Sequence, residues 1–130
     1  MSARAIVLFV AFVLLLASAC VHGFIGIPHL KADLEEIGVR PTLTAAVILG
    51  LYVGLIAMFA FAGMVLAAAI AAWRGLPVSA VTLWIICAFY LALGAGGFLF
   101  FGGHNIHHLG FALIGCLVGF GAYAPAGGRA

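Results

Sequence analysis

The sequence predicts an all-α polytopic membrane protein with four transmembrane helices and a short interfacial helix in the first loop. Of its 130 residues, 68% are hydrophobic and only 6% are charged, whereas about a quarter of the residues in a soluble domain are charged. The apolar residues also gather in long uncharged runs, each close to the roughly 20 residues that a helix needs to cross a bilayer. At this length they form one membrane domain.

The first two runs are the longest. The first continues to Ile27 and passes through LASAC, 16–20; it is longer than the apolar core of a secretory signal, so we expect it to remain as a helix. The second is uncharged from Leu43 to Trp73, long enough to tilt or to extend beyond the bilayer. The predicted transmembrane helices are about 4–26, 43–73, 77–101 and 105–124.

The first loop contains a shorter helix of its own, predicted at about 28–38. Pro28 suits a first helical turn and Gly38 suits the position just after the last one. Apolar residues recur at helical spacing between them. Lys31 and Glu35 stand four residues apart, as an ion pair along a helix requires. We expect this helix to lie along the membrane surface.

The orientation follows from the basic residues. Four helices put both termini on the same side of the membrane, together with Arg4, Arg74 and Arg129, while Lys31 and Arg40 lie on the other side. The positive-inside rule then places both termini in the cytoplasm. The expected location is a plasma membrane or a bacterial inner membrane.

Small residues indicate how the helices associate. Lipid tails are as apolar as leucine, so membrane helices are held together by close packing, which small side chains permit. Such residues recur at every fourth position in the last three predicted helices and favour contacts inside one bundle or between chains. The expected partners are therefore the lipid bilayer and other membrane subunits or a second copy. The predicted packing residues are Gly50, Gly54, Ala92, Gly96, Gly115 and Gly119.

Three of the five histidines fall within the segment GGHNIHHLG, 102–110. This segment can be a polar boundary that ends one helix and starts the next. It can also provide nitrogen ligands for zinc or copper, an axial ligand for haem together with His22, or a group for proton or quinone chemistry. In a four-helix topology all five histidines and all three acids share the non-cytoplasmic side. The candidate metal ligands are His22, His29, His104, His107, His108 and Asp33.

The stretch HNIHH, 104–108, resembles the H-x-x-H-H box of membrane fatty-acid desaturases and hydroxylases. That family uses several such boxes to hold a di-iron centre. This chain has one box and five histidines in all, so the family's activity is not carried over to it.

The remaining sequence contains no pattern typical of an enzyme. The apolar interiors of the four segments lack Asp, Glu, Lys and Arg, which leaves no proton relay or ion path. There is no phosphate-binding loop, and a net charge of +2 is too small for nucleic acid. We therefore expect a membrane protein that acts by helix packing, as a homo-oligomer or as an accessory subunit. The alternative is a metal- or haem-binding protein with its histidine site on the outer face.

Overall fold

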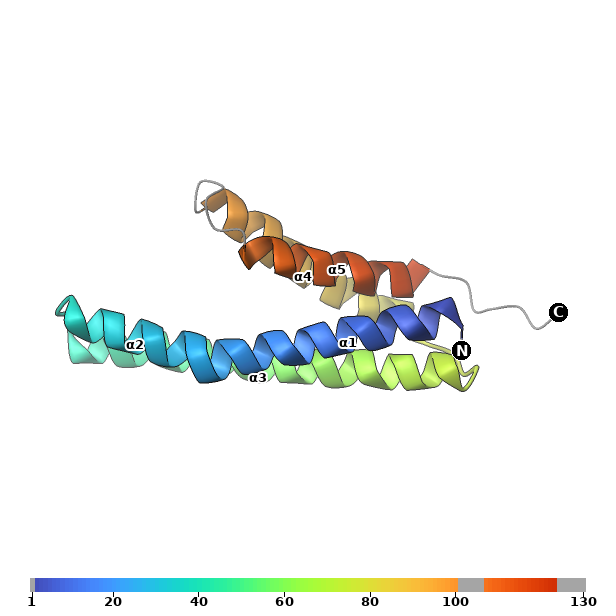
Figure 1. Cartoon of the computed structure of the whole chain (residues 1–130), viewed down its shortest axis with the longest axis horizontal. Helices are drawn as coiled ribbons and strands as arrows, with labels where there is room; N and C mark the ends of the chain where they lie inside the picture. The colour runs from blue at the N-terminus through green and yellow to red at the C-terminus, as the bar shows by residue number, and fades with distance from the viewer. Residues whose placement is uncertain (1, 101–106, 124–130) are drawn as a thin grey trace. The chain divides into compact units, whose positions relative to one another are not determined.

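The computed structural model describes residues 2–100 and 107–123, and every regular element in them is helical (Figure 1). The elements are α1 (Ala3–Val21), the π-helical segment η1 (His22–Gly26), α2 (Ile27–Glu36), α3 (Pro41–Trp73), α4 (Ala80–Phe100) and α5 (His107–Tyr123). Within these described ranges, three helical stretches are long and apolar enough to cross a membrane, namely Ala3–Glu36, Pro41–Trp73 and Ala80–Phe100. This confirms the prediction of an all-α integral membrane protein. The described part of α5 is shorter, with 17 residues.

The ends of α3 and α4 follow from local chemistry. α3 begins at Pro41 rather than at residue 43, because proline suits the first position of a helix. α4 begins at Ala80 rather than at 77, because Ser79 caps it: the Ser79 hydroxyl accepts a hydrogen bond from the Thr82 N–H at 3.4 Å. The start predicted for the last helix, at about residue 105, lies outside the described residues.

The prediction of a separate interfacial helix is corrected at Pro28. The stretch Ala3–Glu36 is one continuous helix, so α2 extends α1 and is not a separate helix. Its position along the membrane surface stays a prediction. Pro28 cannot donate an N–H to the carbonyl of Phe24, and its ring would press against that carbonyl in a regular α-helix. In the wider π-helical turn, the Ile27 N–H bonds instead to the carbonyl of His22. This turn accommodates the proline without ending the helix.

The chain divides into two compact units. The hairpin unit comprises residues 15–62. The bundle unit comprises the remainder, of which residues 2–14, 63–100 and 107–123 are described. The helices α1 and α3 each contribute one part to each unit.

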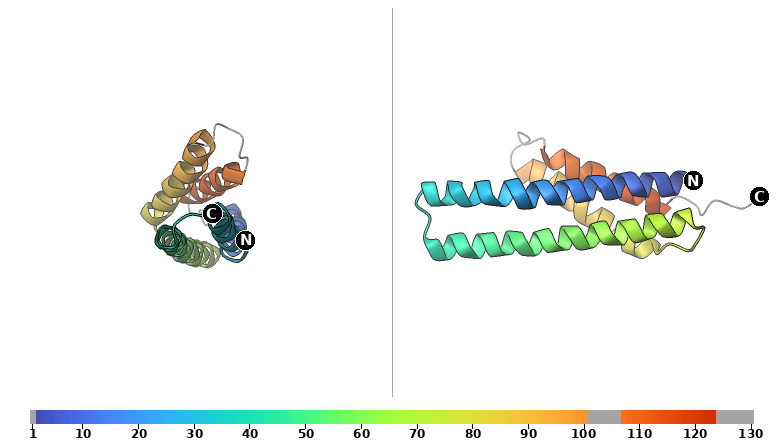
Figure 2. Two further views of the ribbon diagram at one scale, coloured as in Figure 1. Left: turned by 90° about the vertical axis from the view of Figure 1, so that its left-hand side faces the viewer. Right: turned by 60° about the horizontal axis from the view of Figure 1, so that its bottom comes forward.

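In the hairpin unit, the arms 15–36 and 41–62 run antiparallel and lie side by side (Figures 1 and 2). They approach each other closely at Gly23, where an added Cβ would lie 2.8 Å from Cδ2 of Leu55. Glycine is needed here because the leucine side chain occupies the space that a Cβ would take. The buried apolar side chains of this unit are Leu15, Ala19, Ile27, Met58 and Ala62.

The turn between the arms ends α2 at the predicted glycine. Gly38 has a φ of 75°, a left-handed conformation that side chains disfavour. Its N–H donates to the carbonyl of Glu35 at 3.1 Å, and the N–H of Val39 donates to that of Leu34 at 3.0 Å. This is a Schellman motif, which satisfies the last carbonyls of the helix and turns the chain back toward α3.

In the bundle unit, α4 and α5 pack in antiparallel register, with Gly94 against Ala112 near the middle of the contact. Tyr90 is fully buried, and its ring centroid lies 6.1 Å from that of Phe111. The N-terminal part of α1 also belongs to this unit. The fully buried large side chains here are Leu8, Val65, Leu83, Ile86, Tyr90 and Val118.

Candidate functional site

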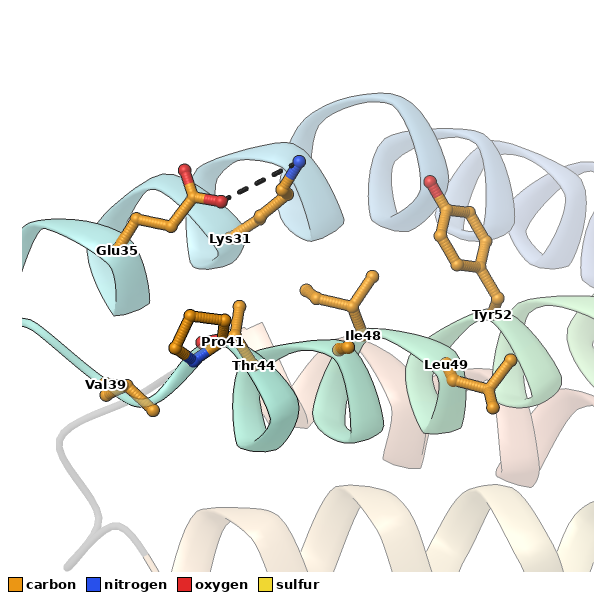
Figure 3. Close-up of a pocket in the computed structure, with 9 residues that line it drawn as sticks. Lys31, Glu35, Val39, Pro41, Thr44, Ile48, Leu49 and Tyr52 are labelled. Carbon is orange, nitrogen blue, oxygen red and sulfur yellow. Dashed lines mark ion pairs between the residues drawn. The ribbon is translucent and has the colours of Figure 1, made fainter.

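A pocket of about 610 Å³ lies between the two arms of the hairpin unit, beside the turn that joins them (Figure 3). Ligand pockets typically measure about 300–1,000 Å³. The α2 wall supplies two charged side chains, and the opposite wall is mostly apolar. Such a pocket suits an amphipathic molecule. The lining residues are Lys31, Glu35, Val39, Pro41, Thr44, Ala45, Ile48, Leu49 and Tyr52.

The charged wall consists of Lys31 and Glu35, whose Nζ and Oε1 atoms lie 3.8 Å apart. This confirms the ion pair predicted from their spacing. Both side chains are well exposed, at 57% and 61%, and an exposed pair typically contributes only about 0.2–1 kcal/mol. Either group can therefore exchange its partner for a charge on a ligand at little cost to the fold.

Thr44 supplies a buried hydroxyl to the opposite wall. The residue is 5% exposed, and its Oγ1 has no hydrogen-bond partner among the described residues. Its backbone N–H is satisfied by the carbonyl of Arg40 at 3.0 Å. A buried hydroxyl without a partner typically costs about 1–3 kcal/mol. It also lies near the N-terminus of α3, where the helix dipole is positive, so this wall favours a hydrogen-bonding or anionic group.

The predicted metal ligands do not form a cluster in the described structure. His22 is half-buried in η1, and His29 and Asp33 are exposed on α2. His104 lies outside the described residues, and of His107 only the backbone at the start of α5 is described. Among the residues that the structure describes, no group of three or more His, Cys, Asp or Glu could hold a metal ion. A zinc, copper or haem site that includes His104 stays a prediction.

His108 instead takes part in helix packing within the bundle unit. Its ring covers Gly97 of α4, where an added Cβ would lie 2.7 Å from Nε2 of the imidazole. The ring also meets Phe111 edge to face, with centroids 6.4 Å apart. The imidazole thus fills the space left by the missing side chain of Gly97 and helps to fix how the start of α5 sits on α4.

The predicted packing glycines of α5 lie at a close helix contact. An added Cβ at Gly115 would lie 3.0 Å from Cγ of Leu91, and one at Gly119 would lie 2.8 Å from Sγ of Cys87. The absence of side chains at these two glycines allows the backbone of α5 to approach α4 closely.

The other predicted packing residues are uncovered within their own units. At Gly50, Gly54 and Gly96 an added Cβ would meet no described atom of the same unit within 4 Å, and Ala92 is exposed. Their contact with another chain stays a prediction.

Gly94 and Gly97 were not predicted, yet of the described glycines in α4 they are the two at which an added Cβ would clash with α5. Ala92 and Gly96 were predicted instead, because the prediction used only small residues at a fixed spacing of four. Helices in contact combine spacings of three and four, and the spacing of three between Gly94 and Gly97 is the signal that could have found them. The pocket was also not predicted, since its walls come from segments on both sides of the turn.

Comparison of the chain with protein-family models, with curated proteins and with solved structures gives no match.

Proposed function

We propose that this chain is a small integral membrane protein that acts by helix packing, through association with a second copy or as an accessory subunit of a larger membrane complex. In this proposal α5 is the fourth span, and both termini are cytoplasmic. The orientation rests on the three arginines expected at the cytoplasmic side, Arg4, Arg74 and Arg129.

The observation that carries the proposal is the uncovered glycine face of α3. Gly50 and Gly54 lie about 40° apart around the helix axis, and no described residue of the hairpin unit covers either one. Gly115 and Gly119 have the same spacing, and there the chain brings two helix backbones into contact.

The same physical reasoning applies to both glycine pairs. A glycine face that meets lipid makes few dispersion contacts, because acyl chains are mobile and pack loosely on it. Against another helix, the face allows close backbone approach and many dispersion contacts. The exposed pair on α3 therefore favours a second helix as its partner.

Association can be measured by counting fluorescently labelled chains per liposome at several protein-to-lipid ratios. Gly50→Leu and Gly54→Leu should weaken self-association, because overpacking a contact typically costs about 1–3 kcal/mol, or roughly 5- to 150-fold in the dissociation constant. For an accessory subunit, the same variants should lose their partner on purification from native membranes.

Gly63→Leu is the matched control. Gly63 is on the same helix, is also uncovered in its own unit, and lies about 180° from Gly54 around the axis. It should associate as the unchanged chain does. Equal weakening by all three variants would show that this face of α3 is not the contact.

A further inference from the structure

The length of α3 and the polarity of its pocket favour a position where lipid headgroups meet acyl chains. α3 has 33 residues, which gives a length of roughly 50 Å at 1.5 Å per residue, against about 30 Å for the hydrocarbon core. Even at a tilt of about 40°, such a helix is longer than the hydrocarbon core, so at least one of its ends reaches into the headgroup layer. At the pocket, apolar residues of α3 stand opposite the charged residues of α2 (Figure 3), which is the change in polarity that a bilayer has at this boundary.

We propose that this pocket binds a zwitterionic phospholipid with a primary ammonium group, of the phosphatidylethanolamine class. The lipid phosphate interacts with Lys31 and with the positive N-terminal end of α3. The lipid ammonium interacts with Glu35. The glycerol and the first part of an acyl chain lie along Ile48 and Leu49, both of which line the pocket.

Thr44 adds an unsatisfied polar group beside the pocket. Its buried Oγ1 has no partner in the described part of the chain, and the residue lines the pocket. In the conformation described, neighbouring atoms close this oxygen off. A rotation of the Thr44 side chain about χ1 would turn the hydroxyl toward the lipid, where a phosphate or ester oxygen would accept its hydrogen bond and remove the cost of leaving it unsatisfied.

The charges favour a zwitterion over an anionic lipid. Lys31 and Glu35 lie only 3.8 Å apart, so the wall presents one positive and one negative group side by side. An anionic headgroup would satisfy Lys31 but would be repelled by Glu35. A headgroup that carries both signs gives each side chain an opposite partner, and a primary ammonium can also donate hydrogen bonds to the Glu35 carboxylate.

The test is native mass spectrometry of the delipidated full-length chain in micelles, titrated with palmitoyl-oleoyl phosphatidylethanolamine and, separately, phosphatidylglycerol. The unchanged chain should bind phosphatidylethanolamine more tightly. Lys31→Gln should weaken both lipids, whereas Glu35→Gln should weaken only phosphatidylethanolamine, by up to about fivefold in each case because the groups are exposed. Thr44→Val should weaken phosphatidylethanolamine about two- to tenfold.

Asp33→Asn is the matched control, since it removes one acid from the same helix at an exposed position that does not line the pocket. It should leave both affinities unchanged. An equal preference for the two lipids in the unchanged chain, or a Glu35→Gln variant with unaltered phosphatidylethanolamine binding, would overturn the proposal. A dimer that is lost in the pocket variants would assign the pocket to a second copy and would overturn it as well.

Discussion

Replacing Gly94 by alanine tests the contact between α4 and α5. An alanine Cβ at this position would lie 2.7 Å from Cβ and 2.8 Å from Cα of Ala112, whereas carbon atoms in favourable contact are about 3.5–4.0 Å apart. The obstructing atoms belong to the backbone of α5 or are attached directly to it. The clash can therefore be relieved only by moving the helix, and overpacking of this kind typically costs about 1–3 kcal/mol.

Gly96→Ala provides the comparison that isolates this cost. Gly96 is two residues further along α4, and an added Cβ there meets no described atom of its unit within 4 Å. Both substitutions remove a glycine from a helix interior, which is worth about 0.8–1.0 kcal/mol in helix propensity and cancels between them. The Gly94 variant should thus be less stable than the Gly96 variant by about 1–3 kcal/mol.

The assay is unfolding in mixed micelles with a rising fraction of sodium dodecyl sulfate, followed by the fluorescence of Trp84. This residue reports on the contact, because an added Cβ at Gly119 of α5 would lie 3.5 Å from its ring. A Trp73→Phe background removes the other tryptophan. If both alanine variants unfold at the same detergent fraction, or if Gly96→Ala is the less stable one, α4 does not face α5 through Gly94 and the reasoning fails.

Two further predictions concern the hydrogen bond of Arg4 and the topology of the chain in the membrane. The Nε–H of Arg4 donates a hydrogen bond to the carbonyl of Gly121 at 2.8 Å. This carbonyl lies near the C-terminus of α5, where the helix dipole favours a cation. Arg4→Gln should therefore lower the stability measured in the same detergent titration by about 1.5–3 kcal/mol. Arg74→Gln, in an exposed turn, should change it little, and equal losses would mean that the Arg4 bond contributes nothing of its own. For the topology, a cysteine-free variant carrying Asp33→Cys should react with a membrane-impermeant maleimide in intact cells, and one carrying Ser2→Cys only after permeabilisation. The opposite labelling pattern would invert the proposed orientation.

Properties that depend on neighbouring residues could be predicted from the sequence. The apolar runs specified an all-α membrane protein, because backbone N–H and C=O groups in lipid must bond within the segment. Gly38 marked the end of α2, because a left-handed turn needs glycine. The spacing of Lys31 and Glu35 placed their charges together on one face.

The faces that make contact could be assigned only from the tertiary structure. α4 is apolar all round, so no polar side shows which face turns toward α5, and the structure selects Gly94 and Gly97 where sequence spacing indicated Gly96. The continuity of α1 with α2 depends on the hydrogen bond from Ile27 across the π-helical turn, a geometry that the presence of a proline does not reveal. The pocket exists because a turn brings the segments on its two sides together, and hydropathy, which is read along one segment at a time, carries no information about such a pairing.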